Sequence, residues 1–243
     1  MTRMMARSRA DGMAHGVHPC PVTRLRIALV ALGFAALLGC LLVLGAIAEG
    51  VREQEANALD AVATPLLHGL ESPTLDAAMR AITNLGSTAF VAPVFAVAVA
   101  GLLWRRRRRE ALFLSVAMAG SLVLNQSLKL FFHRPRPQLP WAQVQPEFSF
   151  PSGHAMNSLV FYVALALIAW ATWGHRVGPI AVALAATLAL VIGTSRIYLG
   201  YHYLTDVAGG FLAGALWLVI VSAAFGGSWV RKERRAGRSQ LRT

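Results

Sequence analysis

Long apolar runs alternate with short polar stretches along most of this chain. An α-helix needs about 20 predominantly apolar residues to cross a bilayer, and six runs approach or exceed that length: residues 27–48, 85–104, 111–132, 155–173, 177–194 and 203–225. The pattern therefore predicts an all-α, polytopic membrane protein with six transmembrane helices.

The segments between and beyond these runs predict how the chain is divided. Residues 49–83 are acidic and carry apolar side chains at helical spacing, which predicts a short amphipathic helical segment on the membrane surface between the first two spans. Residues 1–24 and 227–243 are polar and basic. We therefore expect two basic cytoplasmic tails on either side of a six-helix membrane domain at residues 25–226.

The first apolar run has a second interpretation. It could be a cleaved signal peptide, because Ala46-Ile47-Ala48 resembles a cleavage site. Signal peptides usually have an apolar core of only about 7–15 residues. The length of this run favours a membrane anchor.

Charge gives the predicted spans an orientation. The net charge of +12 could indicate a nucleic-acid-binding protein, but only 14% of residues are charged and the arginines cluster beside apolar runs, as at Arg105–Arg109. Short basic loops face the cytoplasm. We therefore expect no nucleic-acid partner. We expect instead a multi-pass protein of the inner (plasma) membrane, with both termini in the cytoplasm and residues 49–83 outside.

Three polar clusters interrupt the apolar sequence at residues 129–137, 151–154 and 195–206. In the predicted topology all three fall on the outer face, at the ends of the third and fifth spans and the starts of the fourth and sixth. Among their side chains are the three cations Lys129, Arg136 and Arg196, the two histidines His154 and His202, and the single carboxylate Asp206. Such a set of side chains suits the binding and cleavage of an anionic phosphoryl group.

Lys129, Arg136 and Arg196 are cations at or near the outer ends of the predicted spans. Each alone could extend toward lipid headgroups. Together they fit a phosphate clamp, because guanidinium groups bind phosphate oxygens in pairs and an ammonium group adds a point charge.

Residues 151–154 read Pro-Ser-Gly-His and precede an apolar run. They predict a helix N-terminus, whose free N–H groups attract anions. Gly153 allows close approach, Ser152 can add a donor, and His154 is then placed beside the phosphate. Taken alone, His154 could equally be a capping or interface histidine.

His202 and Asp206 are four residues apart, so on a helix they would share one face. A carboxylate that accepts from one ring nitrogen leaves the other free to attack. The alternative is a local pair that only stabilises the start of a helix.

These residues carry a family resemblance. The spacing Lys129…Arg136-Pro137, the Pro-Ser-Gly-His at residues 151–154 and the series Ser195-Arg196…His202…Asp206 resemble the three motifs of the type-2 phosphatidic acid phosphatase superfamily. That superfamily includes membrane lipid phosphatases and vanadium-dependent haloperoxidases.

The resemblance implies a role for each position. His202 would be the nucleophile that forms a phosphohistidine, Asp206 would orient it, and His154 would be the general acid. By the same resemblance, the residues that bind the phosphate would be Lys129, Arg136, Ser152, Gly153 and Arg196. His133 and Arg134 are expected to make secondary substrate contacts at most.

The resemblance also implies a metal-independent enzyme with no cofactor, acting on a phosphorylated lipid in the outer leaflet. Candidate substrates are polyprenyl diphosphates such as undecaprenyl diphosphate, phosphatidylglycerol phosphate and phosphatidic acid. Two alternatives remain open, a vanadate-dependent haloperoxidase and a non-catalytic phospholipid binder or transporter. Cys20 and Cys40 lie in a polar and an apolar segment, so we expect neither a disulfide nor a cysteine metal site.

Overall fold

The computed structural model describes residues 38–52, 58–142 and 146–226. Regular structure in these ranges is entirely helical: residues 38–52, α2 (Ala58–His68), α3 (Pro73–Asn84), α4 (Thr88–Trp104), α5 (Arg108–Phe132), α6 (Gly153–Trp173), α7 (Gly178–Tyr198) and α8 (Leu204–Gly226). The chain divides into two units, residues 1–39 and 40–243, and α2 to α8 belong to the second. The all-α prediction is confirmed for the described residues; both predicted tails and residues 27–37 of the first predicted span lie outside them.

Four helices, α5 to α8, are long and apolar enough to cross a membrane. Helices α3 and α4 meet at 43° and pass the same test as a pair, so the described part of the chain holds four or five candidate spans rather than six. Large apolar side chains on α5, α7 and α8 stay exposed, as side chains facing lipid would: Leu112, Val123, Ile180, Leu184, Val219 and Ile220.

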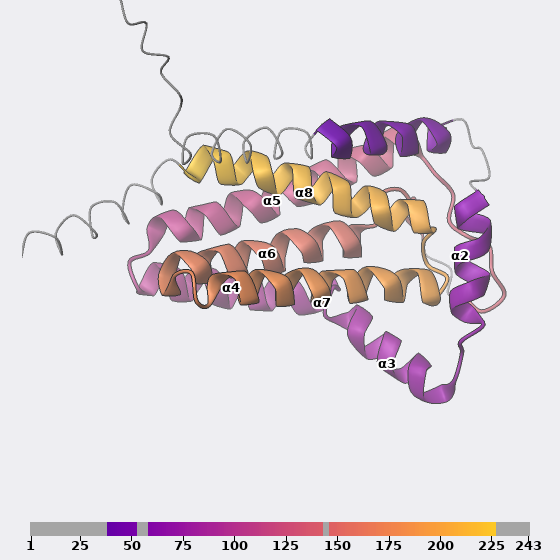
Figure 1. Cartoon of the computed structure of the whole chain (residues 1–243), viewed down its shortest axis with the longest axis horizontal. Coiled ribbons are helices and arrows are strands. Elements are labelled where there is room, and N and C mark those ends of the chain that lie inside the picture. Colours follow the sequence, from indigo (N-terminus) through magenta and orange to yellow (C-terminus); the bar gives the residue numbers. More distant parts are fainter. Residues whose placement is uncertain (1–37, 53–57, 143–145, 227–243) are drawn as a thin grey trace, which may run out of the picture. The chain divides into compact units, whose positions relative to one another are not determined.

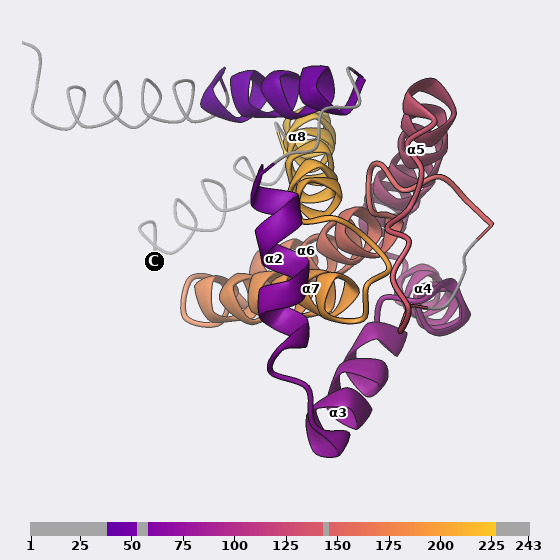
Figure 2. The same ribbon diagram turned by 90° about the vertical axis from the view of Figure 1, so that its right-hand side faces the viewer.

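Helix α6 packs against α5, α7 and α8, and all four run side by side in Figures 1 and 2. Phe113 and Leu114 of α5 meet Val160 and Phe161 of α6 in a core whose large side chains are almost fully buried. Because both faces of these helices are apolar, close packing rather than an apolar–polar contrast decides which face turns inward.

Glycines bring α8 against α6 near the polar end of both helices. A Cβ atom at Gly210 would lie 2.7 Å from the Ser152 carbonyl oxygen, and one at Gly214 would lie 3.1 Å from the Met156 carbonyl oxygen. Small residues permit such contacts between membrane helices. At this contact the Ser152 N–H donates to the Asp206 carbonyl oxygen over 3.0 Å, which joins the starts of α6 and α8.

The end of α7 and the start of α8 matter for the site, and only the first lies more than one residue from its predicted position. Helix α7 continues past residue 194 to Tyr198, so Arg196 lies in its last turn. Helix α8 begins at Leu204, and Gly200, with φ +71°, turns the chain before it. The prediction that His202 and Asp206 share one helix face was therefore wrong, because His202 lies in the turn that precedes α8.

Helices α2 and α3 occupy the segment predicted to be amphipathic. In α2, Asp60 and Thr64 are buried, while Leu59, Val62 and Leu66 are each more than 60% exposed. The buried face of α2 packs on α7 and α8, close to the start of α8 that carries Asp206.

Candidate active site

The three polar clusters meet at one end of helices α5 to α8. Lys129 lies in the last turn of α5 and Arg196 in the last turn of α7. His154 and Asp206 lie in the first turns of α6 and α8. The connection between α5 and α6 adds Arg136, whose guanidinium contacts the His202 ring. The sequence clusters therefore form one polar site, as their predicted topology required.

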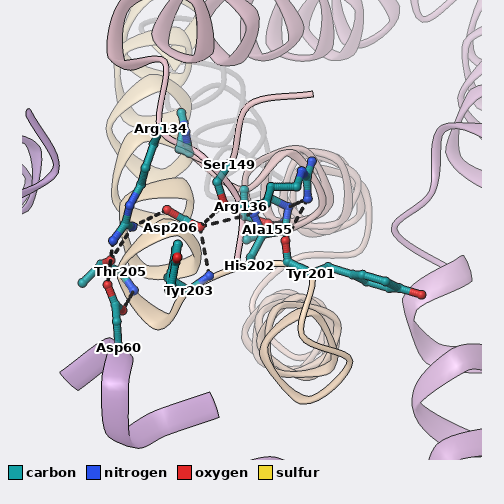
Figure 3. A network of polar contacts seen from close by, with 12 residues as sticks. Asp60, Arg134, Arg136, Ser149, Ala155, Tyr201, His202, Tyr203, Thr205 and Asp206 are labelled. Carbon is teal, nitrogen blue, oxygen red and sulfur yellow. Dashed lines mark hydrogen bonds and ion pairs between the residues drawn. The ribbon is translucent and has the colours of Figure 1, made fainter. Parts of the chain in front are cut away.

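His202 is held at both ring nitrogens (Figure 3). Its Nδ1 lies 3.4 Å from Asp206 Oδ2 and 3.3 Å from the Ser149 hydroxyl. Its Nε2 lies 3.1 Å from Nη1 of Arg136. Because a guanidinium can only donate, Nε2 is the acceptor, and the ring proton belongs on Nδ1. The nitrogen that carries the lone pair therefore faces the cations.

The His202 ring is also held in its neutral form. It is 1% exposed, and burial lowers its pKa to about 4 against the opposing effect of Asp206, with Arg136 and Arg196 lowering it further. An unperturbed histidine has a pKa of about 6.5. The imidazole is therefore neutral at pH 7, which is the form that can act as a nucleophile.

The Asp206 carboxylate is fully buried and its two oxygens have different partners. Oδ2 accepts from the Ser149 hydroxyl at 2.5 Å and from the Tyr203 N–H at 2.9 Å. Oδ1 accepts from Nη1 of Arg134 at 2.5 Å. These bonds fix the plane of the carboxylate, so only Oδ2 is directed at the His202 ring.

Two of the three predicted cations are bound to Glu147. Its Oε2 lies 2.5 Å from Nζ of Lys129, and its carbonyl oxygen accepts from Nε of Arg136 at 2.8 Å. The hydrogen bond and charge of Lys129 lower the pKa of Glu147. Glu147 lies between the sequence clusters and was not predicted as part of the site.

Arg196 has unused hydrogen-bonding capacity. Its guanidinium lies 4.2 Å from the Tyr201 ring centroid, and Nη1 donates to the Thr83 hydroxyl over 3.0 Å. Its buried Nε has no hydrogen-bond partner among the described residues. A buried donor without a partner costs about 1–3 kcal/mol, so an incoming phosphate oxygen would be stabilised there.

The start of α6 is organised as a helix N-terminus. Ser152 is fully buried; its hydroxyl accepts from the Ala155 N–H at 3.5 Å and its own N–H is used by Asp206. Ser152 therefore serves the helix itself, while the N–H groups of Gly153 and His154 have no acceptor within the helix. The His154 ring lies against Gly86, where an added Cβ would be 3.2 Å from its Cδ2.

Arg134 lies between two carboxylates. Its guanidinium binds Asp206 and the Thr205 hydroxyl through Nη1 and Asp60 of α2 through Nη2. Both carboxylates hold the charge in place, and the pKa of Arg134 is raised although burial opposes the charge. The partner Asp60 reaches Arg134 from a helix that the motifs do not include, and whether Arg134 also contacts a substrate stays a prediction.

Comparisons with known proteins give one consistent result. A model of the PAP2 superfamily matches residues 110–229. Phosphatidylglycerophosphatase B of Bacillus subtilis is 32% identical over 154 residues, which are 63% of this chain and 76% of the relative. Decaprenylphosphoryl-5-phosphoribose phosphatase of Mycobacterium tuberculosis is 32% identical over 195 residues, 77% of this chain and 99% of the relative.

The fold agrees with these sequence relatives. The crystal structure of a transmembrane PAP2-type phosphatidylglycerolphosphate phosphatase from Bacillus subtilis aligns with a TM-score of 0.71 at 28% identity. The alignment covers 77% of this chain and 94% of that structure. With its apolar helices and these membrane relatives, the chain is a multi-pass membrane protein.

Proposed function

Because this chain belongs to the PAP2 superfamily, we propose that it is an integral membrane phosphatase that hydrolyses phosphate or diphosphate esters of lipids. The observation that carries this proposal is the His202 ring, which is neutral, oriented by Asp206 at Nδ1, and turned at Nε2 toward Arg136. A nucleophile in this state beside fixed cations suits attack on an anionic phosphorus.

The proposed reaction has two steps. His202 Nε2 attacks phosphorus, the N–P bond forms, the bond from phosphorus to the leaving oxygen breaks, and His154 gives that oxygen a proton. Water then attacks the phosphohistidine, His154 takes up a proton from it, and the N–P bond breaks to release inorganic phosphate. In both steps Lys129, Arg136 and Arg196 would neutralise charge on the phosphoryl oxygens, with Gly153 and Ser152 shaping the N-terminus of α6.

The substrate class follows from the surroundings of the site and from the relatives. The site lies at the ends of apolar helices, where a lipid headgroup can reach it while its tail stays among exposed apolar side chains. The relatives act on a phosphatidylglycerol phosphate and on a polyprenyl-linked phosphate, by their names. We therefore retain phosphatidylglycerol phosphate, phosphatidic acid and polyprenyl diphosphates such as undecaprenyl diphosphate as substrates.

Purified full-length protein should release phosphate from at least one of these lipids in the presence of EDTA, and vanadate should inhibit the release. Among the described residues there is no cluster of three or more histidine, cysteine or acidic side chains fit to hold a metal ion, whereas the cations suit a five-coordinate phosphate mimic. Phosphate release is measured across the lipid panel, with His202→Ala as the blank. Absence of release from every lipid, or loss in EDTA that Mg²⁺ restores, would reject the proposal.

We further propose that the site faces the exterior or periplasm of a six-span protein of the inner (plasma) membrane, with residues 25–226 as the membrane domain and both basic tails cytoplasmic. The support is the distribution of arginine, including Arg105–Arg109 at the end of the helices opposite the site. Reporter fusions after Arg109 and Gly174 should report cytoplasm, and one after Gln138 should report the exterior. The opposite pattern would reject this orientation.

A further inference from the structure

Asp60 is a buried carboxylate of α2 that reaches the start of α8. It is 5% exposed, and every contact of its carboxylate shown here involves Thr205 or Arg134 (Figure 3). Oδ1 accepts from the Thr205 N–H at 2.9 Å, and Oδ2 accepts from the Thr205 hydroxyl at 2.5 Å. The first N–H groups of a helix lack intrahelical partners, so Asp60 caps α8 from a different helix.

Arg134 connects Asp60 with Asp206. Its Nη2 lies 2.8 Å from Asp60 Oδ2 and its Nη1 lies 2.5 Å from Asp206 Oδ1. The guanidinium also lies 4.2 Å from the Tyr203 ring centroid, which limits its movement out of this plane. The guanidinium is rigid and planar. Because this rigid group binds both carboxylates, a shift of Asp60 would also shift Asp206.

We propose that Asp60 is a positioning residue for catalysis, which acts through Arg134 to fix the Asp206 carboxylate against the His202 ring. This inference rests on the proposed function of His202 as the nucleophile. Asp60 itself contacts neither His202 nor the clamp cations in the described structure. It belongs to α2, outside the matched residues 110–229.

Two physical effects give Asp60 this role. First, without it Nη2 of Arg134 loses its acceptor, and the guanidinium can rotate about Asp206 Oδ1 and carry that oxygen with it. Second, the Asp60 carboxylate neutralises part of the Arg134 charge. Without Asp60, more of the Arg134 charge acts on Asp206. Asp206 then stabilises less well the positive charge that the His202 ring gains when the N–P bond forms. A displacement of about 1 Å in a reacting group can cost on the order of 10²-fold in rate. Phosphate binding should hardly change, because its cations are held by other contacts.

The test replaces Asp60 with asparagine, which keeps the shape and removes the charge. In the purified full-length protein, kcat for nitrophenyl phosphate should fall on the order of 10²-fold, while KM and competitive inhibition by inorganic phosphate stay within about threefold. The matched control is Thr64→Val. Thr64 lies one turn further along α2, is 4% exposed, and its hydroxyl has no hydrogen-bond partner among the described residues. This variant should keep the wild-type kcat.

A double-mutant cycle separates positioning from general stability. If Asp60 acts through Arg134, then Asp60→Asn should lower kcat no further in an Arg134→Gln background. Thr205→Val removes the hydroxyl that lies between Asp60 and Arg134, and it should lower kcat by less than Asp60→Asn does. This variant is the substitute test if Asp60→Asn does not fold. Wild-type kcat in Asp60→Asn or Thr205→Val, or additive losses in the double variant, would overturn the inference. An inactive wild-type protein would instead reject the proposed function.

Discussion

Replacement of His202 by alanine should abolish phosphate release from lipid phosphates and nitrophenyl phosphate alike. The expected loss in kcat is roughly 10⁶-fold, the scale seen when a hydrolase loses its nucleophile. Among the described residues only the His202 imidazole has a ring nitrogen in contact with Arg136, so no second histidine is placed to take over the attack. A better leaving group cannot replace a bond that never forms, so no substrate should restore activity.

His175→Ala provides the matched control for the His202 variant. His175 follows the C-terminal end of α6, whereas the site lies at its N-terminal end, and a helix of that length separates them by about 30 Å. The control should retain wild-type kcat. Both variants need the melting temperature of the wild type for the comparison to hold. A His202→Ala protein within tenfold of wild-type kcat would show that His202 is not the nucleophile.

Sequence patterns sufficed for the four apolar helices α5 to α8 and for the ends at which the clusters meet. The apolar runs behind α5, α6 and α8 are long enough that the predicted boundaries differ from the observed ones by only a few residues. The end of α7 was placed too early because Ser195 and Arg196 looked like a polar loop. In the structure they form the last helical turn, which Ser195 supports with a hydrogen bond to the Ile192 carbonyl oxygen.

The second layer of the site could not be read from the chain. Asp60 and Thr205 are 145 residues apart, and the pattern around Asp60 indicates only an amphipathic helix. Ser149 lies in a proline-rich connection that has no periodicity to show which side chains turn inward. The position of Arg134 beside the first motif is visible in the sequence, but its partner is not. Such contacts depend on how α2 packs against α8, which no local pattern encodes.

The prediction that separates the two histidines concerns His154. It lies in the first turn of α6, next to the N–H groups that attract a phosphate. If His154 protonates the leaving oxygen, His154→Ala should lower kcat on a lipid phosphate roughly 10²–10⁴-fold, the usual contribution of general acid catalysis. An alkoxide leaves poorly without that proton.

The nitrophenyl ester supplies the decisive comparison. Nitrophenolate leaves readily without a proton, so His154→Ala should recover much of the wild-type kcat on nitrophenyl phosphate, whereas His202→Ala should recover none. The measurement is the ratio of kcat on nitrophenyl phosphate to kcat on the lipid phosphate, for the wild type and both variants at one pH. This ratio distinguishes the general acid from the nucleophile. Equal recovery of both variants, or recovery of His202→Ala alone, would mean that the roles of general acid and nucleophile are wrongly assigned. Recovery of His154→Ala alone fits only a nucleophile at His202 and a proton donor at His154.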